Sequence, residues 1–296
     1  MSKRNWALFA ATLVSIIYGV TFTIAKDVMP IYVMPYGFIV MRVGGSVVLF
    51  WLAWLFVPKE KIALADFPRI VAAAFFGVAF NMLTFFKGLS YTSPIMGAVL
   101  MVTTPIIVLV LSALLIKEKM KWRRIVGIIL GLIGTVTLIL YGKSMVNAPN
   151  AMLGNFLVFV NAVSYAFYLI IVKKLMDKYN AFTFVKWIYT FGFLMVLPFG
   201  YSEFDAINWS ILPLDVLCKI GFVVVFSTFL TYLLNLVSMR ELKPTTVAVF
   251  IYLQPLFATL FAVSLGKDDI NIIKITSAVL IFLGVYLVTI KLKSEE

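Results

Sequence analysis

The side chains that could do chemistry in this sequence are amides, hydroxyls and phenols set inside long apolar runs. The chain has no histidine, and its 13 aspartate and glutamate residues fall between the apolar runs or near their ends. Hydrolases and transferases need a nucleophile with its base, paired acids or a metal cluster, and these residue types supply none of them inside the runs. We therefore expect no enzyme, no bound metal and no cofactor. A glycine-rich phosphate-binding loop is also missing, so the chain is not an ATP-driven pump by itself.

The polar residues inside the apolar runs are suited to contact a small solute. Facing lipid they would be costly, so they are expected to line a cavity or to bond other helices. The predicted substrate-binding residues are Tyr18, Thr21, Asn81, Thr104, Asn161, Tyr165, Tyr168, Thr231 and Gln254. The tyrosines add aromatic faces with a polar end, which suits an amphipathic organic solute better than a bare ion. For each threonine the alternative is a hydrogen bond to a carbonyl one turn back, and for each tyrosine the alternative is packing.

Arg42 lies deeper in an apolar run than most of the charged residues. It falls about seven residues into its run, which is roughly 10 Å along a helix. A guanidinium keeps its charge at that depth and must find a partner, water or a lipid headgroup. It is either a contact for a substrate carboxylate or phosphate, or a structural residue that reaches outward to the membrane surface or bonds carbonyls at a helix end.

The apolar runs themselves define a membrane protein. Of the 296 residues 63% are hydrophobic and 13% are charged, against about a quarter charged in an ordinary soluble domain. Ten runs are long enough to cross the hydrocarbon layer as helices. They are 6–25, 35–57, 70–86, 94–116, 124–141, 152–172, 182–201, 213–237, 245–265 and 272–290. The sequence therefore predicts an all-α membrane protein with ten transmembrane helices, whose partner is the lipid bilayer.

The positions of the basic residues give an orientation. Most of the 25 lysines and arginines fall in the tails and in alternate loops, so the positive-inside bias places both termini in the cytoplasm and the chain in the inner (plasma) membrane. This placement also argues against a nucleic-acid partner for the basic chain. The stretch KEKMKWRR (117–124) is either an orienting loop or a patch for anionic lipid. The basic, apolar N-terminus is longer than a signal-peptide core and is expected to be the first span.

An internal repeat links two of the spans. Pro94 and Pro105 recur about 150 residues later as Pro244 and Pro255, in register with a charged helix end. Thr104 and Gln254 stand directly before the second proline of each copy, which makes them the favoured pair for contacts at the centre. Pro105 and Pro255 would each free a carbonyl in the preceding turn of the helix.

The repeat predicts a duplicated five-helix unit, with a first copy at 1–145 and a second at 146–296. Because five is odd, the second copy must enter the membrane from the opposite side. Inverted repeats of this kind are associated with transporters whose substrate site lies near the midplane, between the copies. Pro105 and Pro255 are then candidate hinges or gates, and kinks that serve only packing are the alternative.

The whole chain resembles the drug/metabolite transporter superfamily and, within it, the EamA family of permeases. The resemblance rests on the order of elements, YGVTFTIAK in the first span, Arg42 in the second, and the endings LLIKEKMKWRRIVGIILGLIGTVTLIL and VSLGKDDINIIKITSAVLIFLGVYLV. Asp268 stands where the second copy usually has glutamate, while Glu118 keeps that residue in the first copy. The resemblance implies a ten-helix exporter or permease for small metabolites, often amino acids or related compounds, with a central cavity formed by both halves.

We thus expect a transporter of small organic metabolites that works by alternating access. Interior acids and histidines are the usual means of coupling to protons, so their absence favours a facilitator or an exchanger. Sodium coupling stays open, because carbonyls and threonine hydroxyls can hold that ion. A transporter of amphipathic drugs or lipid-linked solutes and a non-transporting membrane sensor are the alternatives. The oligomeric state is left open.

Overall fold

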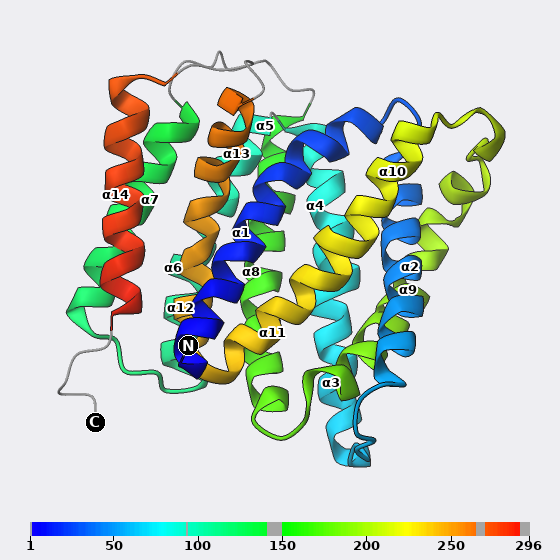
Figure 1. The fold of residues 1–296 in the computed structure, drawn as a ribbon, viewed down its shortest axis with the longest axis horizontal. Coiled ribbons are helices and arrows are strands. Elements are labelled where there is room, and N and C mark those ends of the chain that lie inside the picture. Colours follow the sequence, from blue (N-terminus) through cyan, green and yellow to red (C-terminus); the bar gives the residue numbers. More distant parts are fainter. Residues whose placement is uncertain (1, 93, 141–149, 265–269, 291–296) are drawn as a thin grey trace.

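The chain folds into a bundle of helices, drawn as a ribbon in Figure 1. The computed structural model describes residues 2–92, 94–140, 150–264 and 270–290, and every regular element within these ranges is helical. In lipid a helix satisfies its own backbone hydrogen bonds, which is why long apolar runs adopt this conformation. The α-helices are α1 (Lys3–Val28), α2 (Pro35–Trp54), α3 (Phe67–Ala74), α4 (Phe80–Tyr91), α5 (Pro94–Met101), α6 (Thr104–Leu115), α7 (Trp122–Leu140), α8 (Ala151–Met176), α9 (Ala181–Asp205), α10 (Leu214–Phe222), α11 (Thr231–Glu241), α12 (Pro244–Val249), α13 (Leu253–Ser264) and α14 (Ile272–Thr289).

Within the described residues, nine helical segments are long and apolar enough to cross a membrane. They are Pro35–Trp54, Leu64–Leu89, Gly97–Leu115, Trp122–Leu140, Ala151–Met176, Ala181–Asp205, Leu214–Glu241, Pro244–Phe261 and Ile272–Thr289. Each corresponds to one of the predicted runs. α1 has 26 residues and covers the first predicted run, but it is not among the nine. The prediction of an all-helical, multi-pass membrane protein is confirmed.

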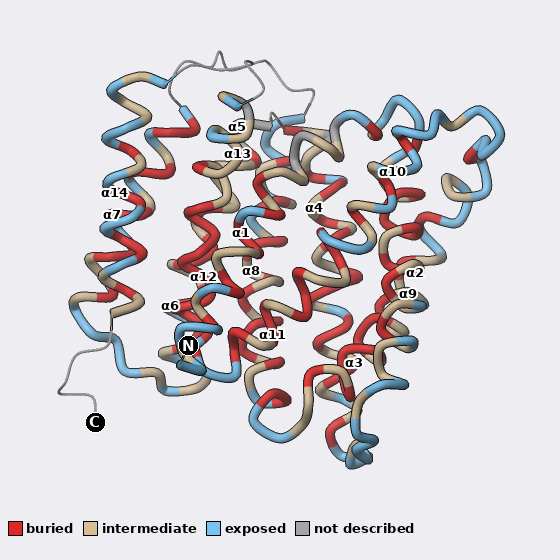
Figure 2. Tube along the Cα trace, in the orientation of Figure 1, coloured by how far each residue is buried: buried red, intermediate tan, exposed pale blue. Residues whose placement is uncertain are grey.

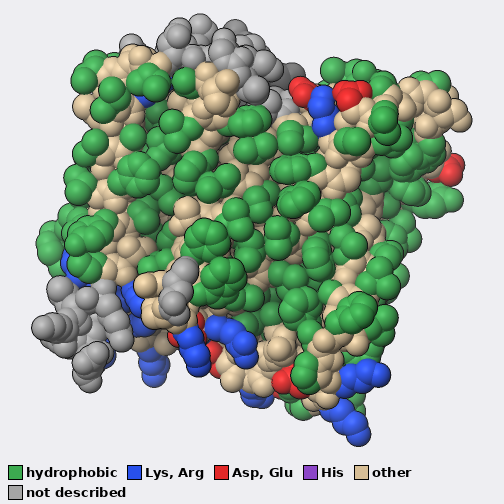
Figure 3. All heavy atoms as spheres, in the orientation of Figure 1, with side chains coloured by type: hydrophobic (Ala, Val, Ile, Leu, Met, Phe, Trp, Pro, Cys, Tyr) green, Lys and Arg blue, Asp and Glu red, His purple; other side chains and the backbone are tan. Residues whose placement is uncertain are grey.

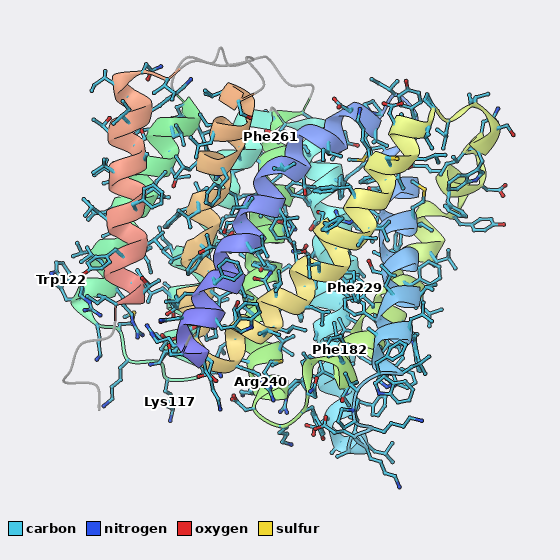
Figure 4. All side chains as sticks on the ribbon, in the orientation of Figure 1. Lys117, Trp122, Phe182, Phe229, Arg240 and Phe261 are labelled. Carbon is cyan, nitrogen blue, oxygen red and sulfur yellow. The ribbon has the colours of Figure 1, made fainter. Side chains whose placement is uncertain are left out.

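The surface has the distribution that a bilayer requires. Figure 3 shows hydrophobic side chains covering the middle of the face in view, with most lysines and arginines along its lower edge. Large apolar side chains such as Leu114, Phe156 and Phe282 are exposed, and lipid is the solvent that makes this exposure favourable. In Figure 4, Lys117 and Arg240 lie near the end of the bundle that holds the N-terminus, and Phe261 lies towards the opposite end.

Two helix pairs fix the edges of the bundle, where α2 packs on α9 and α7 packs on α14. The second pair approaches through glycines. A Cβ atom added to Gly284 would lie 2.5 Å from the carbonyl oxygen of Gly127, and one added to Gly127 would lie 2.7 Å from that of Gly284. Only residues without a side chain permit this backbone contact. Figure 2 shows that buried residues alternate with exposed ones along both helices.

Four of the spans are interrupted at mid-length. The third and eighth predicted runs each contain a π-helical segment, η2 (Phe75–Ala79) and η4 (Val223–Leu230). The fourth run breaks between α5 and α6, and the ninth passes through a short 3₁₀ segment, η5 (Phe250–Tyr252). Short 3₁₀ turns, η1 (Leu64–Asp66) and η3 (Trp209–Ile211), precede α3 and α10.

The break in the fourth run has its cause in the proline. Pro105 cannot donate to the carbonyl of Met101, four residues earlier. The Thr104 hydroxyl donates to this carbonyl instead, at 2.5 Å. The predicted boundary between the two five-helix units, at 145–146, lies outside the described residues, as do Asp268 and the C-terminal tail from residue 291.

Candidate functional site: a cavity within the helix bundle

A cavity of about 550 Å³ lies inside the bundle, a volume ordinary for small-molecule sites. Its wall comes from α1, α2, α4, α5 and α8 and from the spans that contain η4 and η5. The lining residues are Tyr18, Thr21, Ala25, Met29, Pro30, Met34, Pro35, Phe38, Arg42, Asn81, Met82, Phe85, Phe86, Leu89, Met101, Asn161, Tyr165, Ser227, Tyr232, Ile251 and Gln254. Segments from both halves of the sequence therefore enclose one space.

Most of the residues that the sequence singles out come together in this wall. Those that line the cavity are Tyr18, Thr21, Arg42, Asn81, Asn161, Tyr165 and Gln254. Thr104, Tyr168 and Thr231 do not line it, and neither does Pro105 or Pro255. The favoured pair is thus split, with Gln254 in the wall and Thr104 fully buried behind it.

The three residues behind the wall have partners that explain their placement. Thr104 satisfies the carbonyl freed by the proline. Thr231 donates to the carbonyl of Ser227 at 2.7 Å, and its hydroxyl lies 3.2 Å from that of Tyr18. Tyr168 packs its ring 6.0 Å from that of Tyr232. Thr231 therefore reaches the cavity only through Tyr18, which it positions.

Two asparagines hold the wall together at the contact of α4 with α8. The Asn161 amide donates to the backbone carbonyl of Asn81 at 2.7 Å, and the Asn81 amide donates to that of Asn161 at 3.4 Å. Ser164 adds a hydrogen bond to the carbonyl of Phe76 at 2.7 Å. The amides thus serve both as cavity wall and as a link between two helices, which are the two interpretations that the sequence left open.

Arg42 reaches the cavity from α2 and contacts the π-helical segment η4. Its Nε donates to the hydroxyl of Thr228 at 3.2 Å, while this hydroxyl donates to the carbonyl of Val223 at 2.8 Å. The residue is half-buried and faces the cavity. The two interpretations of Arg42, a contact for an anionic substrate group and a structural residue, both stay predictions.

The end of the cavity on the side where α1 begins and α14 ends is filled by tyrosines. The Tyr232 hydroxyl donates to the carbonyl of Gly77 at 2.8 Å, and the Tyr168 ring lies against Gly77 where any Cβ would stand. Tyr189 packs edge-on against Tyr232, with ring centroids 5.1 Å apart. The opposite end is bordered by Met29, Pro30 and Met34, in the connection between α1 and α2. The cavity therefore extends from the middle of the bundle to the α1–α2 connection.

Much of this wall could not be recognised from the sequence. Besides the polar residues, it consists largely of methionines and phenylalanines, with alanine, proline, leucine and isoleucine side chains between them. An apolar side chain inside such a run looks the same whether it faces lipid, a neighbouring helix or a cavity. Proximity to the polar residues by one helical turn, as for Phe85 and Asn81, is the signal that could have found some of them.

Membrane-spanning helices around a cavity that carries polar side chains at membrane depth are an arrangement that multi-pass membrane transporters have. A family model described as the EamA-like transporter family matches the chain twice, over residues 5–140 and 152–290. The protein therefore belongs to the EamA-like transporter family, as its resemblance indicated.

The names of individual relatives are consistent with the family assignment. An uncharacterized transporter of Archaeoglobus fulgidus is 26% identical over 97% of this chain and 99% of its own. The uncharacterized transporter YyaM of Bacillus subtilis is 24% identical over 92% of this chain and 89% of its own. A WAT1-related protein of Arabidopsis thaliana is 22% identical, over 95% of this chain and 82% of its own. A solved structure described only as a crystal structure of a protein matches with a TM-score of 0.74 at 16% identity, covering 95% of both chains, which establishes a shared fold.

Proposed function

We propose that the protein carries small organic metabolites, amino acids or related compounds first among them, across the inner membrane by alternating access. The observation that carries the proposal is the cavity itself. It is walled by segments from both family matches, extends to one end of the bundle and is filled by Tyr168, Tyr189 and Tyr232 towards the other. A carrier caught open to one side of the membrane has this geometry.

The proposal includes ten spans in two inverted five-helix repeats, 1–145 and 146–296. In it, α1 is the first span and is added to the nine apolar segments described above. Paired irregularities support it. The third span of each unit holds a π-helical segment, and the fourth is broken just before Pro105 or Pro255. In Figure 1, α1 starts at the lower end and α8 at the upper end, so the first helix of each unit runs in the opposite direction. The bends before the two prolines are then natural hinges for the exchange between states.

The orientation follows from the charges. With the basic end of the bundle and both termini in the cytoplasm, the cavity opens to the outside in this conformation. Substrate contacts are assigned to Tyr18, Thr21, Asn81, Asn161, Tyr165 and Gln254 in the wall. Thr104, Tyr168 and Thr231 act through residues that line the cavity or by shaping its closed end.

The transport mode that we propose is facilitated diffusion or exchange. No aspartate or glutamate is among the described residues that line the cavity, so the wall offers no acid that could carry a proton between the two sides. Amphipathic drugs are the second candidate substrates, because methionines and phenylalanines make up much of the wall. A sensor that binds a solute without moving it is the remaining alternative.

Counterflow in proteoliposomes tests the proposal. Vesicles containing the purified protein are loaded with one unlabelled amino acid or related metabolite at a time, and entry of its labelled form is followed without an ion gradient. We expect transient accumulation for at least one solute and its loss in Gln254→Ala. Thr137→Ala is the matched control, because this exposed hydroxyl bonds only its own helix. A protein that binds a solute but gives no counterflow for any member of a broad panel would be a sensor.

A further inference from the structure

Arg42 is the one charged side chain among the described residues that line the cavity. Its position is set by Thr228, whose hydroxyl accepts from Nε. This contact leaves the two terminal nitrogens of the guanidinium without a hydrogen-bond partner among the described residues. A guanidinium held by Nε presents these two nitrogens as a fork, the geometry that carboxylates, phosphates and sulfonates match with two oxygens.

No acidic side chain of the described residues forms an ion pair with Arg42. Three acids near the open end of the bundle, Asp27, Asp215 and Glu203, have other partners. Asp27 lies 3.0 Å from the amine of Lys219, and Asp215 lies 3.3 Å from the same amine. A carboxylate oxygen of Glu203 accepts backbone N–H groups at the start of α2. The positive charge in the cavity is therefore not neutralised by the described protein groups, although an isolated charge at membrane depth is costly.

The rest of the wall complements this charge. Phe38 lies one turn from Arg42 on α2, and Phe85 and Phe86 face the same space from α4. Met29, Met34 and Met101 add flexible apolar surface, which adapts to ligands of different shape. An anionic head at Arg42 would thus leave the remainder of a solute against aromatic and thioether side chains.

We propose that the substrates are amphipathic organic anions, whose carboxylate, sulfonate or phosphate is held by Arg42 and whose apolar body packs on the phenylalanines and methionines of the wall. The inference rests on the proposed transport function and narrows its substrate class. An amino acid would bind Arg42 through its carboxylate. Its ammonium group finds no acid in the described part of the wall, so it adds little to binding.

The test uses three probes of similar size with fixed charges. 2-Phenylethanesulfonate is an anion at all relevant pH values, benzyltrimethylammonium is a cation, and phenylacetamide is neutral. Each is added at equal concentration as a competitor of counterflow, with any solute that the metabolite panel has shown to be carried. We expect the sulfonate to compete and the quaternary ammonium not to compete, a comparison that requires no mutant protein.

Substitution of the arginine gives the second test. In Arg42→Gln we expect the concentration of sulfonate needed for half-inhibition to rise about tenfold or more, because a charge-assisted contact is lost. Arg42→Lys keeps the charge but lacks the two-pronged guanidinium. Its half-inhibiting concentration of sulfonate should lie between those of Arg42→Gln and the wild type. Lys174→Gln removes the same charge from an exposed position on the last turn of α8 and should not change the value.

The outcomes separate the two proposals. Competition by the quaternary ammonium at least as strong as that by the sulfonate overturns the anion inference and leaves transport intact. Equal half-inhibition by the sulfonate in the wild type and in Arg42→Gln also overturns it. Absence of counterflow for every solute in the panel contradicts the proposed function itself. If Arg42→Gln does not fold, the competition assay on the wild type and the half-inhibition by sulfonate in Arg42→Lys still test the anion inference.

Discussion

Glu203, at the end of α9, binds the first turn of α2, and Glu60, just after α2, binds the start of α9. Glu203, in the last turn of α9, accepts the backbone N–H of Tyr36 in α2 at 2.6 Å. Glu60, which follows α2, accepts the N–H of Asn180 and the hydroxyl of Thr183 at the start of α9, both at 2.8 Å. A carboxylate at a helix N-terminus satisfies free N–H groups and complements the helix dipole. The antiparallel pair α2 and α9 is thus fastened at both ends by equivalent contacts, which is the arrangement that an inverted repeat would generate.

This relationship predicts a loss of stability when the cap is removed. Glu203→Ala should lower the free energy of unfolding by about 1 kcal/mol, the usual cost of losing a helix cap. Asp205→Ala is the matched control, since Asp205 is an exposed acid two residues further on with no described partner. The measurement is thermal unfolding of the purified protein in one detergent. An equal shift of the midpoint in both variants would show that the cap contributes nothing.

The glycine contact between α7 and α14 predicts a larger effect. Gly284→Ala would place its Cβ 2.5 Å from the carbonyl oxygen of Gly127, so the two helices must separate. We expect a loss of about 1–3 kcal/mol, as for other overpacked sites. Gly221→Ala meets nothing within 4 Å and provides the control. It should leave the unfolding midpoint unchanged or raise it, because alanine favours a helix more than glycine does. A midpoint for Gly284→Ala at or above that of Gly221→Ala contradicts the prediction.

Hydropathy predicted the helices because, in lipid, each apolar run must pair its own backbone N–H and C=O groups in hydrogen bonds. The polar residues of the wall could be predicted for a similar reason, since Asn161 and Gln254 inside apolar runs need a partner or water. The π-helical segments could not be predicted, because their residues are as apolar as those of ordinary spans. The caps by Glu60 and Glu203 were also missed, because both acids lie outside the apolar runs and their contacts depend on how distant helices pack.

Two threonines show the same limit of prediction from sequence at the candidate site. Thr21 and Thr104 have the same side chain and similar surroundings in the sequence, and both donate to carbonyls of their own chain segments. Only Thr21 lines the cavity. The face of the helix on which each residue lies decides the difference, and in a span apolar all round the sequence does not reveal that face.

The orientation proposed from the charges predicts a labelling pattern. In a Cys218→Ser background, Ser210→Cys places a single exposed thiol before α10, at the open end of the cavity, and Lys174→Cys places one at the opposite end. A membrane-impermeant maleimide added to right-side-out vesicles should label the first variant and not the second. Permeabilised vesicles should show labelling of both, which controls for reactivity. The reverse pattern in sealed vesicles would place the termini outside.

Pro105 and Thr104 allow the role of the broken helix to be separated from that of the substrate site. Thr104→Val removes the hydroxyl that bonds the Met101 carbonyl, leaving a buried acceptor without its partner. We expect a loss of about 1–3 kcal/mol in the free energy of unfolding. In Pro105→Ala the restored backbone N–H can bond the same carbonyl, so Thr104→Val should cost about 1 kcal/mol less in that background. Thermal unfolding of the four proteins measures this coupling.

The same four proteins test the hinge by their counterflow rates. If the bend before Pro105 serves the exchange between the two open states, Pro105→Ala should be at least as stable as the wild type and transport several-fold more slowly, because a continuous helix resists bending. Thr104→Val should keep the same half-saturation for substrate, since Thr104 lies behind the wall. Wild-type rates in Pro105→Ala would assign the proline to packing alone. Additive stability losses in the double variant would contradict the bond between the Thr104 hydroxyl and the freed carbonyl.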